Sequence, residues 1–187
     1  MTAAIAADPR GATDDTIFVC VRPAESRLRI ETHREEGEGD VLVDVSLLRK
    51  FKIFDELNDR ELEQIAKTGK LEDLGPGATL TQAGAPANRL YLIVEGRVTV
   101  NVEGPQGKTI GADELGPGQV LGWSALVGPY IYTASGVTEE KTTVVVFSGS
   151  KLREMFEINN HIGYRVLKGM GAVISRRITA LENKAVQ

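Results

Sequence analysis

The residues best suited to chemistry lie in two short segments that a loop separates. The first segment is Gly122-Trp123-Ser124-Ala125, and the second is Tyr132-Thr133-Ala134. A glycine that opens a short helical turn after a strand leaves backbone N–H groups unpaired, and such groups attract an anion. The hydroxyls of Ser124 and Thr133 can donate further hydrogen bonds. The two segments therefore predict a binding site for an anionic ligand.

The segments around this site are typical of short strands separated by glycine turns. One short strand ends directly before Gly122, and Leu-Gly-Pro-Gly occurs twice, at 74–77 and 115–118. We interpret this recurrence as turn chemistry, because the flanking segments do not repeat. Short strands at this spacing predict a sandwich, jelly roll or barrel. The other strands are expected at 71–74, 79–82, 90–94, 98–102, 109–115, 133–137 and 142–147.

Helical patterns lie on both sides of the strands. Ser46 is expected to cap a short helix over 46–50, and Asn58 or Asp59 is expected to cap a second helix. After the strands, Ser150 is expected to cap a hinge helix over 151–156. A long helix then runs from about 159 or 160 to 182, with apolar residues at three- and four-residue spacing. These residues are Ile162, Val166, Met170, Val173 or Ile174, Ile178 and Leu181.

The predicted fold class is mainly β with flanking helices (α+β). It is an eight-stranded antiparallel β-roll or jelly roll, followed by a hinge helix and a long C-terminal helix. Residues 1–15 are small and polar, which predicts a disordered N-terminus, and 16–45 form a β-prone extension. Residues 46–149 hold the leading helices and the roll, and 150–187 hold the C-terminal helices.

Composition excludes several classes of protein. The net charge is −4, so no global basic field favours nucleic acid. A single cysteine, Cys20, allows no internal disulfide. The first residues lack a basic stretch followed by a long apolar run, and no segment is long and apolar enough to span a membrane. We expect a cytoplasmic protein that binds neither nucleic acid nor membrane.

The sequence also lacks the patterns of an enzyme. A β-roll occurs in metal enzymes of the cupin type, which need two closely spaced histidines and an acid on strands. The two histidines, His33 and His161, lie far apart and outside the expected roll. No serine–histidine–aspartate pattern, phosphate-binding loop or dinucleotide fingerprint is present. We expect no catalytic residue, no metal site and no enzyme activity.

The order of elements over 47–181 resembles the cyclic nucleotide-binding domain of catabolite-activator-type regulators, kinase regulatory subunits and cyclic-nucleotide-gated channels. Gly77, Gly84, Gly96 and Gly118 match the turn glycines of that family, and 91–98 resembles its central hairpin. The family's phosphate-binding cassette reads approximately Phe-Gly-Glu-Leu-Ala-Leu, then a loop, then Arg-Thr or Arg-Ser and Ala. The resemblance implies a regulatory, ligand-sensing domain.

Two positions of this cassette differ in chemistry. In the family the glutamate accepts hydrogen bonds from the ribose 2′-hydroxyl, and here Trp123 replaces it. The family's arginine neutralises the cyclic phosphate, and here Tyr132 replaces it. Two lost charged hydrogen bonds amount to about 3–6 kcal/mol. This loss corresponds to an affinity on the order of 100- to 10,000-fold weaker. We therefore expect lost or altered specificity for cAMP and cGMP.

Two interpretations of the site stay open. In the first, the amides near Ser124 and Ala125 and the two hydroxyls hold a cyclic nucleotide or another phosphate-bearing or anionic small molecule, on which Trp123 and Tyr132 stack. The ligand-binding residues are then Gly122, Trp123, Ser124, Ala125, Tyr132, Thr133 and Ala134. In the second, the two aromatic side chains fill the site as core. The chain is then a ligand-free protein-interaction or dimerisation module.

The long C-terminal helix indicates which partners the chain could bind. In the family this helix caps the ligand and often pairs two subunits, and its apolar stripe favours a homodimer here. The alternative is that the stripe packs on the chain's own roll. Gly163, Gly169 and Gly171 either allow close approach of another segment or mark a bend. Arg176, Arg177 and Lys184 form a weak basic patch that is expected on a solvated helix face. A further protein partner is expected, but the sequence does not identify it.

Overall fold

Two antiparallel four-stranded sheets form the centre of the fold. The structure is a computed structural model that describes residues 43–103 and 109–185. All of these residues belong to one unit of the chain, Glu38–Gln187. The strand order is β1-β8-β3-β6 in one sheet and β2-β7-β4-β5 in the other. The strands are β1 (Gly69–Leu74), β2 (Thr79–Thr81), β3 (Arg89–Glu95), β4 (Val98–Glu103), β5 (Thr109–Leu115), β6 (Val120–Leu121), β7 (Ala134–Thr138) and β8 (Thr142–Ser148). This arrangement confirms the predicted eight-stranded β-roll.

Strands β3 and β8 are apolar on both faces, because each face packs against a different layer. On β3, Tyr91 and Ile93 belong to a cluster between the two sheets, whereas Leu90 and Leu92 belong to a cluster against the helices. Successive side chains of a strand point to opposite faces, so a strand covered on both sides becomes a continuous apolar run. The two strands therefore join the roll to its helices.

The leading helices are α1 (Val45–Leu48), the 3-10 helix η1 (Lys52–Phe54) and α2 (Asp59–Ala66). The expected cap at Ser46 is wrong: Asp44 caps α1, and its Oδ1 accepts a hydrogen bond from the Ser46 amide at 2.6 Å. Of the two expected caps of α2, Asn58 is the actual one, and it forms a capping box with Glu61 through backbone–side-chain hydrogen bonds of 2.9 and 3.0 Å. The predicted N-terminus and extension up to residue 42 lie outside the described residues.

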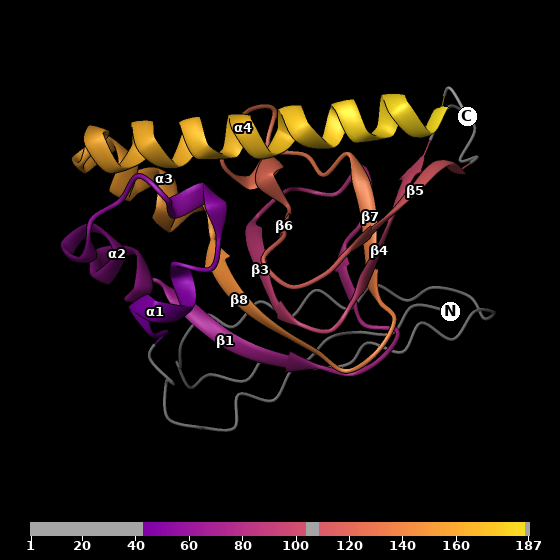
Figure 1. Ribbon diagram of the computed structural model, residues 1–187, viewed down its shortest axis with the longest axis horizontal. Coiled ribbons are helices and arrows are strands. Elements are labelled where there is room, and N and C mark those ends of the chain that lie inside the picture. The colour runs from indigo at the N-terminus through magenta and orange to yellow at the C-terminus, as the bar shows by residue number, and fades with distance from the viewer. Residues whose placement is uncertain (1–42, 104–108, 186–187) are drawn as a thin grey trace, which may run out of the picture. The chain divides into compact units, whose positions relative to one another are not determined.

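Two C-terminal helices follow the roll, α3 (Gly149–Ile158) and α4 (Asn160–Ala185). The cap of α3 is Ser148 rather than Ser150, since the Ser148 Oγ accepts from the Lys151 amide at 3.5 Å. Figure 1 shows α4, in yellow, extending from above α3 towards the ends of β4, β7 and β5. Its buried residues Ile162, Val166 and Met170 pack into the cluster between the helices and the sheet. This half of the predicted stripe therefore packs on the chain itself.

Close approach explains two of the helix glycines. A Cβ at Gly163 would lie 2.7 Å from the Cβ of Phe156, and a Cβ at Gly169 would lie 2.6 Å from the carbonyl oxygen of Ile53. At Gly171 nothing lies within 4 Å. The first two glycines allow α3 and η1 to lie against α4, and the third faces open space.

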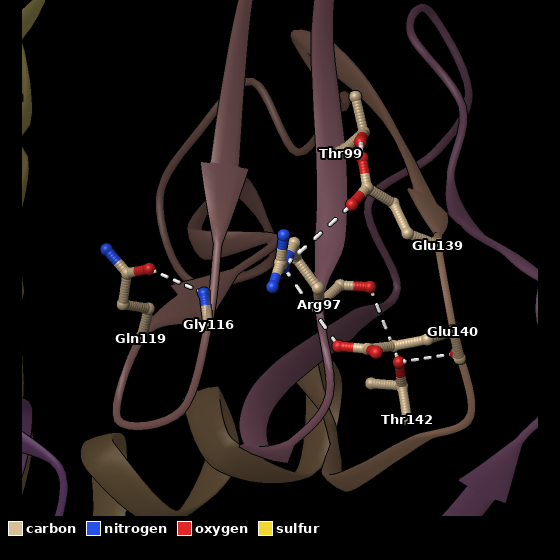
Figure 2. Close-up of polar contacts among 7 residues, drawn as sticks. All are labelled: Arg97, Thr99, Gly116, Gln119, Glu139, Glu140 and Thr142. Carbon is tan, nitrogen blue, oxygen red and sulfur yellow. Dashed lines mark hydrogen bonds and ion pairs between the residues drawn. The ribbon is translucent and has the colours of Figure 1, made fainter.

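A polar cluster supports the turns at one end of the roll (Figure 2). The Nε of Arg97 lies 3.9 Å from Oε2 of Glu139 and 4.0 Å from Oε1 of Glu140. The hydroxyl of Thr142 donates to the carbonyl of Glu140 at 2.9 Å. Gly96 has φ +90°, and a Cβ there would lie 2.5 Å from the Thr142 Oγ1. The β3–β4 turn therefore requires glycine.

Candidate functional site

A cavity of about 160 Å³ lies between the roll and α4. Six of the seven residues expected at the ligand site line it: Gly122, Trp123, Ser124, Tyr132, Thr133 and Ala134. The remaining lining is mostly apolar and comes from several strands and the helix: Thr81, Val100, Val102, Leu121, Ile174, Arg177 and Ile178. The roll thus brings the two predicted segments together at one hollow, and α4 forms its opposite wall.

The first segment turns sharply because Gly122 adopts φ +79° between β6 and the 3-10 helix η3 (Trp123–Ala125). A Cβ at this glycine would lie 2.6 Å from the carbonyl oxygen of Arg89 and 3.2 Å from the Tyr132 ring. Within the turn, the Ala125 amide donates to the Gly122 carbonyl at 2.9 Å, so it is not free for an anion. The Trp123 and Ser124 amides donate to no described residue. Within this turn, these two amides are therefore available to a ligand.

Ala125, the seventh expected site residue, does not line the cavity. Its side chain is fully buried in a small cluster with Ala87 and Tyr132. Its carbonyl oxygen accepts a hydrogen bond from the Arg153 guanidinium of α3. The same guanidinium lies 4.4 Å from the centre of the Tyr130 ring, a cation–π contact. The structure thus places Ala125 behind the cavity, where it joins the cassette to the hinge helix.

Tyr132 is buried and its hydroxyl is already hydrogen-bonded. The hydroxyl donates to the carbonyl oxygen of Arg89 at 2.9 Å and accepts from the amide of Arg89 at 3.0 Å. Burial raises the pKa of Tyr132 above its ordinary value, so the side chain stays neutral. A hydroxyl has one proton to donate, and here the backbone holds it. Tyr132 therefore serves the cavity as an aromatic wall.

Trp123 has a mixed environment. It is half-buried, packs against the cluster between the helices and the sheet, and lines the cavity as well. Its indole presents a flat apolar surface and a single N–H donor. Together with Tyr132 it makes the cavity a place where a planar group can pack.

Arg177 contributes a positive charge that the sequence analysis did not assign to the site. Its Nη2 lies 3.2 Å from Oδ2 of Asp113 on β5, and each of the two side chains is 22% exposed. Since Arg177 also lines the cavity, it is a half-buried site residue, and the expectation of a solvated helix face is wrong for it. The sequence spacing could have predicted this position of Arg177. Arg177 lies four residues after Val173 and seven after Met170, so it falls on the same face of α4 as the apolar residues that pack on the chain itself.

Other kinds of site find no support in the part of the chain that the structure describes. Its histidine, cysteine, aspartate and glutamate residues form no group of three that could hold a metal ion. None of the helices between residues 43 and 185 is long and apolar enough to cross a membrane.

A two-sheet β-roll with a glycine-opened turn before β7, and a long helix across the resulting hollow, defines a ligand-binding regulatory fold. The pattern of the family described as cyclic nucleotide-binding domain matches residues 71–159. A cyclic nucleotide-binding-like protein from Brucella abortus is 30% identical with a TM-score of 0.51, covering 61% of this chain and 97% of its own. The chain belongs to the cyclic nucleotide-binding domain family.

Two further relatives agree with this assignment. The structure of a protein from Geobacter metallireducens assigned as cyclic nucleotide-binding is 28% identical, with a TM-score of 0.65. It covers 73% of this chain and 98% of its own. A cyclic nucleotide-gated potassium channel of Mesorhizobium japonicum is 29% identical over 108 residues, which is 57% of this chain. The chain spans only 28% of the length of that channel.

Proposed function

We propose that this domain is a regulatory module that binds a small anionic molecule in the cavity between η3 and α4. The observation that carries the proposal is the convergence of six expected site residues with Arg177 on one cavity. The family supports a role in ligand sensing, and the channel relative is named for its gating by cyclic nucleotides. The ligand supplies the negative charge, and Arg177 with the hydroxyls of Ser124 and Thr133 supplies the polar contacts.

The lining favours a ligand other than a standard cyclic nucleotide. No carboxylate lines the cavity, so it offers a ribose hydroxyl no charged acceptor. Its volume of about 160 Å³ is below the ~300–1,000 Å³ typical of pockets for drug-sized ligands. A ligand of nucleotide size therefore requires α4 to move outward. We propose that specificity for cAMP and cGMP is lost or altered.

Ligand binding is coupled to α4 through Arg177. In the structure this guanidinium pairs with Asp113 and joins the helix to β5. An anion in the cavity competes with the Asp113 carboxylate for the same guanidinium. Binding then shifts the population between two positions of α4, because the ligand interacts differently with each.

Calorimetry with paired variants tests this function. The native protein is titrated with cAMP and cGMP to millimolar concentration, and a panel of nucleotides and small organic anions is screened by thermal shift. Arg177→Gln is expected to weaken the best ligand at least tenfold, since a hydrogen bond to a charged group contributes about 1.5–3 kcal/mol. Asp113→Asn is expected to strengthen it, because it removes the competing carboxylate. Equal effects of the two variants would contradict the proposal.

The second candidate function is a homodimerisation module. Tyr164, Leu167, Gly171, Ile174 and Ile178 alternate at three- and four-residue spacing on α4, the pattern of a coiled-coil seam. Tyr164 is 66% exposed and Ile178 is 52% exposed. Sedimentation velocity tests it: Leu167→Glu is expected to yield monomers, while Thr179→Glu, exposed on the same helix, leaves the assembly intact. A native monomer at high concentration would exclude this function.

We further propose that the module is cytoplasmic and has no enzyme activity, as expected from the composition and from the motifs of the sequence. We keep the predicted division into a roll with its leading helices at 46–149 and C-terminal helices at 150–187. The β-prone segment at 16–45 is proposed as a separate extension. Limited proteolysis followed by mass spectrometry tests this division, with first cleavage expected before residue 46.

A further inference from the structure

A second cavity, distinct from the proposed ligand site, shares the lining residue Arg177 with it. Its volume is about 390 Å³. Segments far apart in sequence line it: the chain between α1 and η1, the turn before β6, and α4. Four of its lining residues are cations, and none is a carboxylate: Lys50, Lys52, Arg176 and Arg177. The structure therefore gathers like charges around a hollow.

Three of these four cations differ in their ion pairing from several other exposed cations of the described chain. Lys168 pairs with Glu56 at 2.8 Å, and Arg49 pairs with Asp59. By contrast, Lys50, Lys52 and Arg176 make no ion pair with any side chain that the structure describes. The whole chain carries a net charge of −4, so a local surplus of positive charge is not a consequence of composition. Converging like charges favour binding of a counter-anion.

The neutral wall of the cavity adds a suitable donor. The Gln119 Oε1 accepts a hydrogen bond from the Gly116 amide at 2.6 Å, as Figure 2 shows. This bond fixes the side chain and leaves its NH₂ group without a partner among the described residues. The amides of Gly118 and Gln119 already donate to the carbonyls of Ile93 and Gly116. Binding here depends on side chains, and chiefly on their charge.

We propose that this cavity is a second anion site, which binds a polyphosphate group. Two lysines and two arginines match several phosphate oxygens at once, because lysine acts as a point charge and arginine as a planar donor fork. A single monoanion would leave most of these charges uncompensated. The polyphosphate is either free or the tail of a nucleotide, and both sources share this chemistry.

Arg177 links the two sites, since it lines both cavities. A polyphosphate near Arg176 also interacts with the Arg177 guanidinium, which otherwise pairs with Asp113. Occupation of either cavity then changes the affinity of the other by the same factor. This coupling rests on the proposed function, whereas binding in the basic cavity does not.

The test is calorimetry of the full chain with tripolyphosphate and, separately, with ATP at constant ionic strength. Lys50→Gln/Lys52→Gln/Arg176→Gln removes three cations that do not line the first cavity. The matched control Arg60→Gln/Lys67→Gln/Lys151→Gln removes three exposed cations elsewhere. We expect one binding event, weakened at least tenfold in the first variant and within twofold of native in the control. Tighter binding of ATP than of tripolyphosphate identifies a nucleotide, and equal binding identifies a free polyphosphate.

Two results would overturn the proposal. One is the absence of any tripolyphosphate binding by the native protein at millimolar concentration. The other is an equal loss in both triple variants, which would mean general attraction to surface charge. Circular dichroism confirms the fold of each variant. The single substitution Arg176→Gln perturbs the protein less than the triple variant and is measured beside it. Because none of these substitutions touches the first cavity, failure here leaves the outcome of the cAMP and cGMP titrations unaffected.

Discussion

The Tyr132 hydroxyl forms two hydrogen bonds with the backbone of a single residue, Arg89. It donates to the Arg89 carbonyl at 2.9 Å and accepts from the Arg89 amide at 3.0 Å. The start of β3 is thereby attached to the segment before β7. The position that carries the family's phosphate-binding arginine thus has a structural role in this chain, and the positive charge at the cavity comes from Arg177 on α4 instead.

Tyr132→Phe is expected to destabilise the domain. The change leaves the amide and carbonyl of Arg89 unsatisfied beside a buried ring, which costs about 1–3 kcal/mol. Urea unfolding followed by circular dichroism measures this loss. Tyr130→Phe, at an exposed tyrosine close by, is the control and should change stability by no more than about 0.5 kcal/mol. An unchanged unfolding midpoint for Tyr132→Phe would show that the two hydrogen bonds add nothing.

The double variant Trp123→Glu/Tyr132→Arg is expected to gain affinity for cAMP. It restores both charged groups of the family's cassette, at positions that already line the cavity. Each restored hydrogen bond is worth about 1.5–3 kcal/mol, and the loss of the Tyr132 bonds offsets part of this. We expect binding at least tenfold tighter than native by calorimetry. The variant Trp123→Gln/Tyr132→Gln is the neutral control, and an equal gain there would rule out charge as the cause.

Two glycines on α4 form a matched pair for a stability test. At Gly169 an added Cβ would lie 2.6 Å from the Ile53 carbonyl oxygen, and at Gly171 it would meet nothing within 4 Å. Gly169→Ala is therefore expected to cost about 1–3 kcal/mol by forcing η1 and α4 apart. Gly171→Ala is expected to stabilise the domain by up to about 1 kcal/mol through helix propensity. Chemical unfolding measures both, and changes of the same sign would refute the assigned contact.

Stability is expected to fall at alkaline pH because of Tyr91. Burial in the core, and then the neighbouring Tyr132, raise the pKa of Tyr91 to about 12 from its ordinary value of 10.0. The folded state therefore keeps the phenol proton at a pH where the unfolded state loses it. The stabilisation is complete below pH 10 and is lost as the pH rises towards about 12.

Urea unfolding between pH 9 and 12 measures this dependence. Tyr91→Phe should flatten the decline, because the substituted ring has no proton to lose. Tyr164→Phe, at a tyrosine that is 66% exposed on α4, is the matched control and should follow the native curve. If the slope of Tyr91→Phe equalled that of the native protein, another group would be responsible.

Local patterns in the sequence were sufficient for much of the fold. Alternation and glycine turns predicted the strands, and the polar pair at 58–59 predicted a helix start that the structure contains, with Asn58 as its cap. The caps at Ser46 and Ser150 were wrong by two residues in each case, because Asp44 and Ser148 lie at the actual boundaries. Several polar residues near a helix start can cap it, and the surrounding packing selects one.

The sequence by itself determined the family, the order of elements and six of the residues around one cavity, because strand and turn preferences act over a few residues. Only the tertiary structure showed that Tyr132 is bonded to Arg89, that Arg177 meets Asp113, and that Lys50 and Lys52 lie near Arg176. These pairs are distant along the chain and come together only when the roll closes and α4 crosses it. Burial and long-range packing, rather than local preference, therefore decided which charged groups lie at each cavity.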